Sequence, residues 1–411
     1  MKDKFFFQCV NCNAEYPGHQ VLYLCPKCSS LDSQQPPKGV LKVLYHYNEM
    51  SKSGMDFRTL DQKGFVDLLP ITELSFFPNL RIGNTPLYKI DGTSGNSFPF
   101  DLYLKDDSQN PTFSLKDRAS ALVSAYAREK QLNVIVAAST GNAGSSIAGI
   151  CASQGQRSVV LVPASAPAAK LTQMIMYGAV VVPVDGTYDD AFDLSVQISN
   201  EYGWYSRNTA YNPLTVEGKK TVSLELFRDM NYQIPDRIFV PVGDGVIISG
   251  VYKGFEDLLK LNLIDKIPVI VAVQAEGSCN LIRNLNTGFF RSENSRTIAD
   301  SISVDYPRNY YMAREFNHHY HGAHITVTDI EILNASKKLA ASTGIFAEPA
   351  AAAAFAGFQK YYAINRIEQG SRNVVLLTGS GLKDIGSVQP ILSLPEPVQP
   401  DLETVKRFLK L

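Results

Sequence analysis

The sequence predicts an α/β protein with two domains, each built on a parallel sheet, preceded by a small cysteine-bearing segment. Three observations lead to this prediction. Short apolar runs rich in Val and Ile recur along the chain, helical patterns lie between them, and most runs end in Gly, Pro or a small polar residue. Wholly apolar strands that alternate with helices are typical of parallel sheets buried on both faces. There are more of these runs than one sheet usually contains, so we expect two α/β domains.

The elements follow one another in a regular order. Strands are expected at residues 99–107, 133–138, 158–163, 180–186, 237–245, 268–277 and 373–381. Helices are expected at residues 116–127, 142–154, 189–203, 246–261 and 329–344. In open α/β sheets, ligands bind beyond the carboxyl ends of the strands, where a loop meets a helix N-terminus. The strand–helix junctions are therefore the places to search for function.

The composition excludes several classes of function. The chain has 411 residues, of which 45% are hydrophobic and 19% charged, and a formal net charge of -1. This balance offers no basic surface for nucleic acid or an anionic membrane. No stretch reaches the roughly 20 apolar residues that cross a bilayer, and the apolar run in MKDKFFFQCVNC is too short for a signal peptide. We expect a soluble, cytoplasmic protein.

Four of the six cysteines are arranged as two C-x2-C pairs near the N-terminus: Cys9 with Cys12, and Cys25 with Cys28. This spacing is typical of a structural zinc site in which four thiolates bind one ion. The alternative is a loose arm of four reduced or disulfide-bonded cysteines, although disulfides are rare in cytosolic chains. The Pro- and Gln-rich stretch that follows, within residues 29–39, has the character of a linker.

The first junction is NPTFSLKDRAS, residues 110–120. Ser114 and Asp117 resemble a capping box, with Ser114 as the N-cap, which places Lys116 in the first turn of a helix. Burial and the helix dipole both lower the pKa of an amine there, and a neutral amine attacks an aldehyde to form a Schiff base. A solvated surface lysine is the ordinary alternative.

Three further junctions carry polar groups. Ser139-Thr140-Gly141-Asn142 follows a strand and offers hydroxyls and free N–H groups to an anion, and Asn142 has an amide that can donate to an oxygen. Residues 243–247, Gly243-Asp244-Gly245-Val246-Ile247, have the form of a phosphate cradle before a helix. Thr378 places a hydroxyl at the end of the last strand. Each could equally be a plain turn.

Together, the four junctions supply an activated lysine, an oxygen-facing Asn, a phosphate cradle and a hydroxyl partner for a ring nitrogen. Pyridoxal phosphate has an aldehyde, a phenolic oxygen, a phosphate and a pyridine nitrogen that need these four groups. The sequence therefore predicts this cofactor. A nicotinamide enzyme is disfavoured, because Ile248 stands where the last glycine of G-x-G-x-x-G would be.

The order of these motifs resembles that of the threonine synthases, in the tryptophan synthase β-like class of pyridoxal phosphate enzymes (fold type II). The resemblance rests on NPTFSLKDR at 110–118, STGN at 139–142 and TGSGLKD at 378–384, with further echoes in NPLTVEGKKT, VQAEG and FAEPAAAA. It runs collinearly over roughly residues 80–390. The residues that it assigns are Lys116 for the Schiff base, Asn142 for the phenolic oxygen, Gly243, Asp244, Gly245, Val246 and Ile247 for the phosphate, and Thr378 for the pyridine nitrogen.

The resemblance implies a carbon–oxygen lyase reaction. O-phosphohomoserine and water would become threonine and phosphate by γ-elimination and addition of water at Cβ, with Ser139 and Thr140 binding the substrate. It also implies three parts: a zinc-ribbon-like segment at 1–35, a large cofactor-binding domain from 36–118 and 212–411, and a small inserted domain at 119–211. We expect a homodimer.

Several residues depart from the family pattern. The family usually reads Asn-Pro-x-Arg-x-Glu-Gly, and its Arg helps to bind the substrate's phosphate, but Thr215 stands there in this chain. Ser380 replaces a His, and Asp244 and Val246 replace neutral Asn or Gly in the cradle. Arg308 is a candidate replacement cation. Two other functions therefore stay open: a serine/threonine dehydratase or β-replacement synthase, and a non-catalytic relative or zinc-ribbon scaffold that binds partners.

Overall fold

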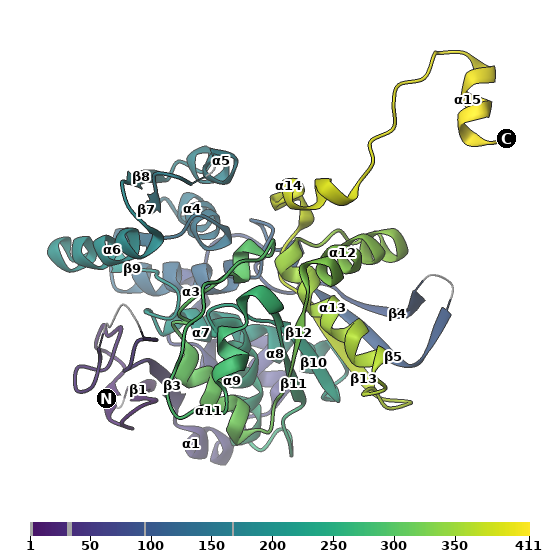
Figure 1. The fold of residues 1–411 in the computed structure, drawn as a ribbon. Helices are drawn as coiled ribbons and strands as arrows, with labels where there is room; N and C mark the ends of the chain where they lie inside the picture. The colour runs from purple at the N-terminus through teal and green to yellow at the C-terminus, as the bar shows by residue number, and fades with distance from the viewer. Residues whose placement is uncertain (1–2, 31–34, 94–95, 167) are drawn as a thin grey trace.

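A six-stranded sheet forms the centre of the larger lobe in the computed structural model, which describes residues 3–30, 35–93, 96–166 and 168–411 (Figure 1). The strand order is β12-β11-β10-β13-β5-β4. Five of these strands are parallel, and β4 pairs antiparallel with β5 at the edge. The bounds are β4 Leu87–Thr93, β5 Asn96–Asp106, β10 Arg237–Pro241, β11 Val269–Ala275, β12 Ala323–Val327 and β13 Arg372–Leu377.

Both faces of this sheet are covered by helices. Alternate residues of β10 show this: Ile238 and Val240 pack into one core, and Phe239 packs into the other, as expected when successive side chains point to opposite faces. One face carries α12 (Asp329–Thr343) and α13 (Pro349–Ala363). The other carries α3 (Lys116–Glu129), α7 (Leu214–Lys219), α8 (Thr221–Asp229), α9 (Val246–Lys260) and α11 (Tyr310–His319). The short α10 (Asn280–Asn284) lies on the same side.

The smaller lobe has a four-stranded parallel sheet in the order β8-β7-β6-β9. Its strands are β6 Val134–Ala138, β7 Arg157–Pro163, β8 Val180–Val184 and β9 Tyr205–Ser206. Its helices are α4 (Asn142–Gln154), α5 (Ala168–Met176) and α6 (Tyr188–Tyr202). The prediction of two parallel-sheet α/β lobes is confirmed.

The N-terminal segment forms an antiparallel sheet of its own in the order β2-β1-β3. Its strands are β1 Phe5–Cys9, β2 Glu15–Pro17 and β3 Leu41–Tyr45, and β3 follows the expected linker. Tyr45 and Tyr47 then join this part to the large lobe, because their hydroxyls donate to Glu217 (2.7 Å) and Asp257 (2.6 Å). Two short helices follow, α1 (Tyr47–Lys52) and α2 (Phe57–Gln62).

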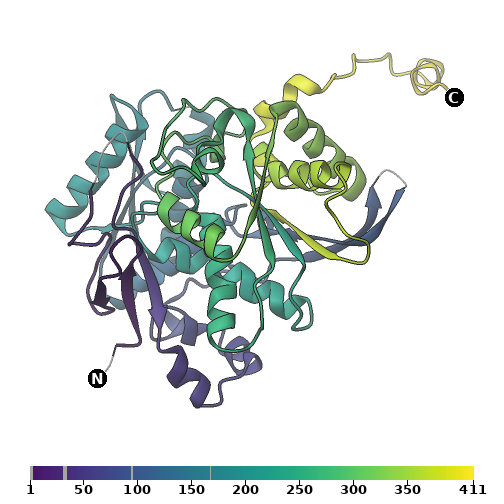
Figure 2. The same cartoon turned by 60° about the horizontal axis from the view of Figure 1, so that its bottom comes forward.

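The chain ends in an arm that leaves the body. After α14 (Ile385–Val388) it runs outward to α15 (Leu402–Leu409), and both views show this tail projecting from the rest (Figures 1 and 2). None of the α15 side chains is buried. Across the described part of the chain, no helix has the length and apolar character needed to cross a membrane.

Helix α13 approaches the sheet closely at Gly357. A Cβ atom at this position would lie 2.5 Å from Cγ2 of Val273 on β11, so the contact needs glycine. We expect Gly357→Ala to lower the free energy of unfolding by ~1–3 kcal/mol through overpacking, measured by urea denaturation. Gly386→Ala in α14 is the control, because nothing lies within 4 Å of its Cβ position. Equal effects of the two changes would contradict this account.

Candidate active site

Lys116 is the first residue of α3 and lies in the wall of a cavity between the two lobes. Burial lowers the pKa of its amine, although Glu348 acts in the opposite direction. The neutral amine that the sequence predicts is therefore favoured by the surroundings of Lys116.

The turn before Lys116 differs from the predicted capping box. Ser114 is not the N-cap: the helix begins at Lys116, Leu115 precedes it, and the Ser114 hydroxyl is buried without a hydrogen-bond partner in the described chain. Instead, the Asp117 carboxylate accepts hydrogen bonds from the backbone N–H of Thr112 (2.6 Å) and from its hydroxyl. The turn is thus closed by a carboxylate that reaches backward to Thr112.

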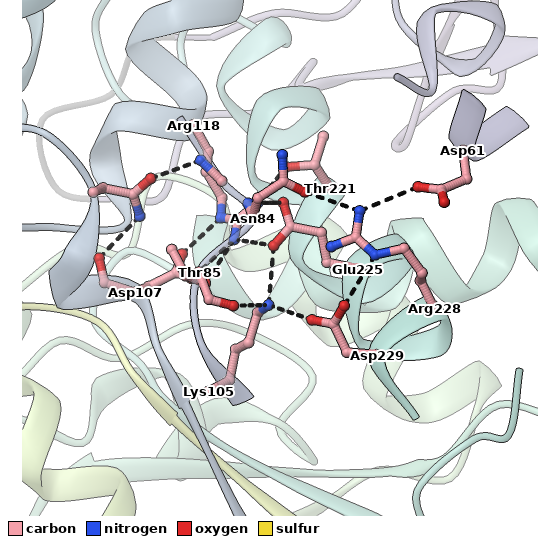
Figure 3. Close-up of polar contacts among 12 residues, drawn as sticks. Asp61, Asn84, Thr85, Lys105, Asp107, Arg118, Thr221, Glu225, Arg228 and Asp229 are labelled. Carbon is pink, nitrogen blue, oxygen red and sulfur yellow. Dashed lines mark hydrogen bonds and ion pairs between the residues drawn. The ribbon is translucent and has the colours of Figure 1, made fainter. Parts of the chain in front are cut away.

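Arg118 holds the start of α3 in place through two carboxylates (Figure 3). Its guanidinium binds the Asp107 carboxylate through Nε (2.6 Å) and Nη2 (2.9 Å), and the Glu225 carboxylate through Nη1 (2.6 Å) and Nη2 (2.8 Å). Lys105 also reaches Glu225 at 3.0 Å. Burial alone would raise the pKa of Glu225, but these two cations hold it well below its usual range. Paired planar groups of this kind fix geometry as well as charge.

The turn at residues 139–142 lies where β6 ends and α4 begins. The backbone N–H of Gly141 donates to the Ser139 hydroxyl at 3.3 Å. The amide nitrogen of Asn142 donates to both oxygens of Glu348, at 2.8 and 3.0 Å. Thr140 and Gly141 lie between Ser139 and Asn142 in the sequence, and both line the cavity that contains Lys116.

The cradle at residues 243–247 ends at the N-terminus of α9. Gly245 has φ +85°, which favours glycine, and a Cβ on Gly243 would lie 2.8 Å from the Cα of Ile302. Burial raises the pKa of Asp244, whose side chain accepts the N–H of Arg308 at 3.3 Å. This carboxyl is therefore held by the backbone of residue 308, which limits its repulsion of an anion in the cradle.

The structure brings most of the predicted residues to one cavity of about 470 Å³. The lining includes Lys116, Ser139, Thr140, Asn142, Gly243, Asp244, Gly245, Val246 and Ile247. Thr378 is buried behind this lining, at the end of β13, where its carbonyl accepts the N–H of Leu115 at 2.9 Å. It thus adjoins the turn that carries Lys116.

These residues fit pyridoxal phosphate. The first N–H groups of α9 have no intrahelical partners, and they follow a turn in which a Cβ at position 243 would collide with the backbone of Ile302. The favoured neutral form of Lys116 suits an aldehyde. Two buried cations, Arg207 and Lys219, lie close enough to Lys116 for their charges to interact. The α9 N–H groups and Lys116 by themselves match a phosphate and an aldehyde in one cavity.

Glu348 is a site residue that sequence reasoning missed. It stands just before α13, is 3% exposed, and its charge acts on Lys116 while its oxygens bind Asn142. Burial raises the pKa of this carboxyl. The sequence signal that could have pointed to Glu348 is the Glu-Pro pair before the alanine-rich run, because it places an acid directly before a buried helix.

The four N-terminal cysteines converge as predicted. Their sulfur atoms all lie within 4.8 Å of one another, with Cys9 3.4 Å from Cys28 and Cys12 3.7 Å from Cys25. Each cysteine is a free thiol. Four sulfur ligands around one point are the set that a structural zinc ion takes, so this cluster could hold zinc.

Comparisons with known proteins agree with this geometry. The profile of the family described as "Pyridoxal-phosphate dependent enzyme" matches residues 79–379. Threonine synthase from Methanocaldococcus jannaschii is 33% identical over 411 residues, covering 98% of this chain and 99% of that protein. Threonine synthase from Halalkalibacterium halodurans is 35% identical over 340 residues, covering 82% of this chain and 94% of that protein.

Solved structures show the same fold. The processed form of threonine deaminase isoform 2 from Solanum lycopersicum superposes with a TM-score of 0.67 at 22% identity, covering 83% of this chain and 95% of that one. Maize serine racemase superposes with a TM-score of 0.62 at 22% identity, covering 75% and 91%.

The ion pairs of Arg118 give a first prediction for this site. We expect Arg118→Met to lower the free energy of unfolding by ~3–5 kcal/mol, because Asp107 and Glu225 would lose a buried partner. Arg407→Met, on exposed α15, should change it by less than ~0.5 kcal/mol. Chemical denaturation of both variants measures the difference. A value for Arg118→Met near that of the control would show that the pairs add nothing to stability.

The cysteine cluster gives a second prediction. Purified protein should carry one zinc ion per chain, and Cys12→Ser should reduce this content, since a thiolate ligand is lost. Metal analysis by mass spectrometry measures both. Cys151→Ser is the control, because Cys151 is buried in the core apart from the cluster. Protein that never takes up zinc from zinc-supplemented medium would contradict the assignment.

Proposed function

The chain belongs to the pyridoxal-phosphate dependent enzymes, and from that premise we propose that it converts O-phosphohomoserine and water into L-threonine and phosphate. The observation that carries this proposal is the similarity to threonine synthases along nearly the whole length of both chains. The cavity supports it by collecting the lysine, the Asn and the cradle in one place.

Bound pyridoxal phosphate withdraws electrons from the substrate carbon atoms near the amino group, which makes their protons easier to remove. Lys116 would hold the cofactor's aldehyde, and the cradle at residues 243–247 would hold its phosphate. Asn142 would donate to the phenolic oxygen, and the Thr378 hydroxyl would meet the pyridine nitrogen. A neutral hydroxyl at that nitrogen, unlike a carboxylate, does not hold a proton on it.

Lys116 would also move protons. An amine whose pKa is lowered can accept a proton from Cα and return it at working pH. Lys116 lines the same cavity as the turn at 139–142 and the cradle, and it would serve Cα and then Cβ. Removal of the Cβ proton would expel phosphate from the γ-carbon, and water would then add with its hydroxyl at Cβ and a proton at Cγ.

Ser139 and Thr140 would bind the substrate. They stand at the N-terminus of α4, where hydroxyls and free backbone N–H groups favour an anion such as a carboxylate. The substrate is a small molecule. We also propose a homodimer, for which exposed apolar side chains such as Leu402 and Phe408 offer surface to bury.

A second candidate function keeps the cofactor and changes the substrate. Thr215 stands where the family has an arginine for the substrate's phosphate, which favours a serine/threonine dehydratase or a β-replacement synthase. Parallel assays of phosphate release from O-phosphohomoserine and of ammonia release from serine and threonine distinguish these functions.

The central test changes Lys116. We expect Lys116→Ala to abolish the visible absorption band of the bound cofactor and to reduce phosphate release from O-phosphohomoserine by at least ~10²–10⁴-fold, since the proton carrier is lost. Lys337→Ala, an exposed lysine of α12, is the control and should behave as the unchanged protein. Retention of the band and of phosphate release in Lys116→Ala would overturn the proposal.

A further inference from the structure

Residue 215 has no role as a phosphate ligand here. Thr215 is buried, and its hydroxyl donates to the carbonyl of Asn212 at 2.7 Å and accepts the N–H of Ala210 at 3.3 Å. The candidate replacement Arg308 lines the cavity, but it already pairs with Asp189 and lies over the Phe192 ring at 3.8 Å. A phosphorylated substrate would therefore need cations from elsewhere.

Lys219 is one such cation. It lies four residues after Thr215 on α7, which places both residues on one face of the helix. Lys219 is 2% exposed and lines the cavity. Within residues 3–30, 35–93, 96–166 and 168–411, its amine makes no hydrogen bond or ion pair. Burial, followed by the charges of Arg207 and Lys116, lowers its pKa well below the usual value.

Arg207 is the second cation. It follows β9, is 1% exposed, and donates from Nε to the Ser120 hydroxyl (3.2 Å) and from Nη1 to the Thr209 hydroxyl (2.7 Å). Its Nη2 is buried without a partner, and no carboxylate pairs with it in the described chain. Arg118, equally buried, has two carboxylates. Thr209 itself lines the cavity, so Arg207 lies directly behind the lining.

Burial favours the neutral form of the Lys219 amine and leaves Arg207 with an unpartnered Nη2, so an anion beside both groups would favour the charged amine and satisfy the guanidinium. A phosphate monoester carries close to two negative charges and accepts several hydrogen bonds, which suits an ammonium and a guanidinium together. The cofactor's phosphate has its own donors, the N–H groups at the start of α9. Lys219 lies within electrostatic range of Asp244 in that cradle, so the pair would bind a second phosphate beside the first.

We propose that Lys219 and Arg207 bind the phosphate group of the substrate, in place of the arginine that Thr215 replaces. This inference rests on the proposed function. It makes the chain selective for a phosphorylated amino acid, because an unphosphorylated serine or threonine would leave the Arg207 Nη2 without a partner and Lys219 without an anion.

The test uses Lys219→Gln and Arg207→Gln as holoenzymes, with inorganic phosphate as the probe. We expect each change to raise KM for O-phosphohomoserine ~10–100-fold, the range of a lost charge-assisted hydrogen bond. Inhibition by inorganic phosphate should weaken in parallel, kcat should change less, and the cofactor's visible band should stay. Arg207→Lys keeps the charge and should recover part of the affinity. Phosphate should raise the Tm of the unchanged holoenzyme more than that of either Gln variant.

The controls separate the alternatives. Lys360→Gln removes a lysine of α13 that donates to the Thr326 carbonyl, and it should leave KM unchanged. If the Gln variants lose the cofactor on dialysis but show an unchanged KM once the cofactor is added back, the two side chains bind the cofactor's phosphate. That result would overturn the inference. Unchanged KM and unchanged phosphate inhibition in both Gln variants would also overturn it, while leaving the proposed reaction in place. Failure of the unchanged enzyme to release phosphate would refute the reaction itself.

Discussion

The two-sided contact of Arg118 with Asp107 and Glu225 is the interaction on which the rest of the site depends. It joins the end of β5, the start of α3 and the body of α8 through one planar group (Figure 3). Because Arg118 stands two residues after Lys116, fixing its guanidinium fixes the first helical turn. Lys116 is thereby presented to the cavity by a scaffold of strand and helix rather than by a free loop.

Two neighbouring buried lysines of the large lobe differ in their partners. Lys220 is fully buried and paired with Glu217 (2.5 Å) and Asp257 (2.7 Å), in a cluster that also receives Tyr45 and Tyr47 from the N-terminal part. Lys219, its neighbour in sequence, borders the cavity and has no such partner among the residues that the structure describes. Two neighbouring lysines therefore have different surroundings: Lys220 is neutralised within the protein, and Lys219 is the one that we propose binds a ligand.

Much of the fold and part of the site could be predicted from local sequence. Apolar runs identified most of the parallel strands but not β9 or β12. The strand–helix junctions pointed to Lys116, Asn142 and the cradle, which the structure brings to one cavity, because backbone turns and helix starts have local signals. The C-x2-C spacing likewise anticipated the sulfur cluster. Domain limits, the homodimer and the ligand contacts of each residue stay predictions.

What local sequence could not reveal depends on tertiary contacts. The Ser114 hydroxyl matched a capping pattern, yet Asp117 bonds backward to Thr112 instead, because the buried turn offers its carboxylate nearer donors. Glu348 and Lys219 lie within the stretches FAEPAAAA and NPLTVEGKKT, but their roles, like that of Arg207, come from burial and from which partners are close. The unpaired cations have one more consequence. A ligand that binds only the folded chain stabilises it in proportion to the logarithm of its concentration, and proteases cleave the open population. If the two side chains bind the substrate's phosphate, newly made chains in a cell short of that substrate should therefore be degraded sooner, so that substrate supply affects how much of this protein accumulates.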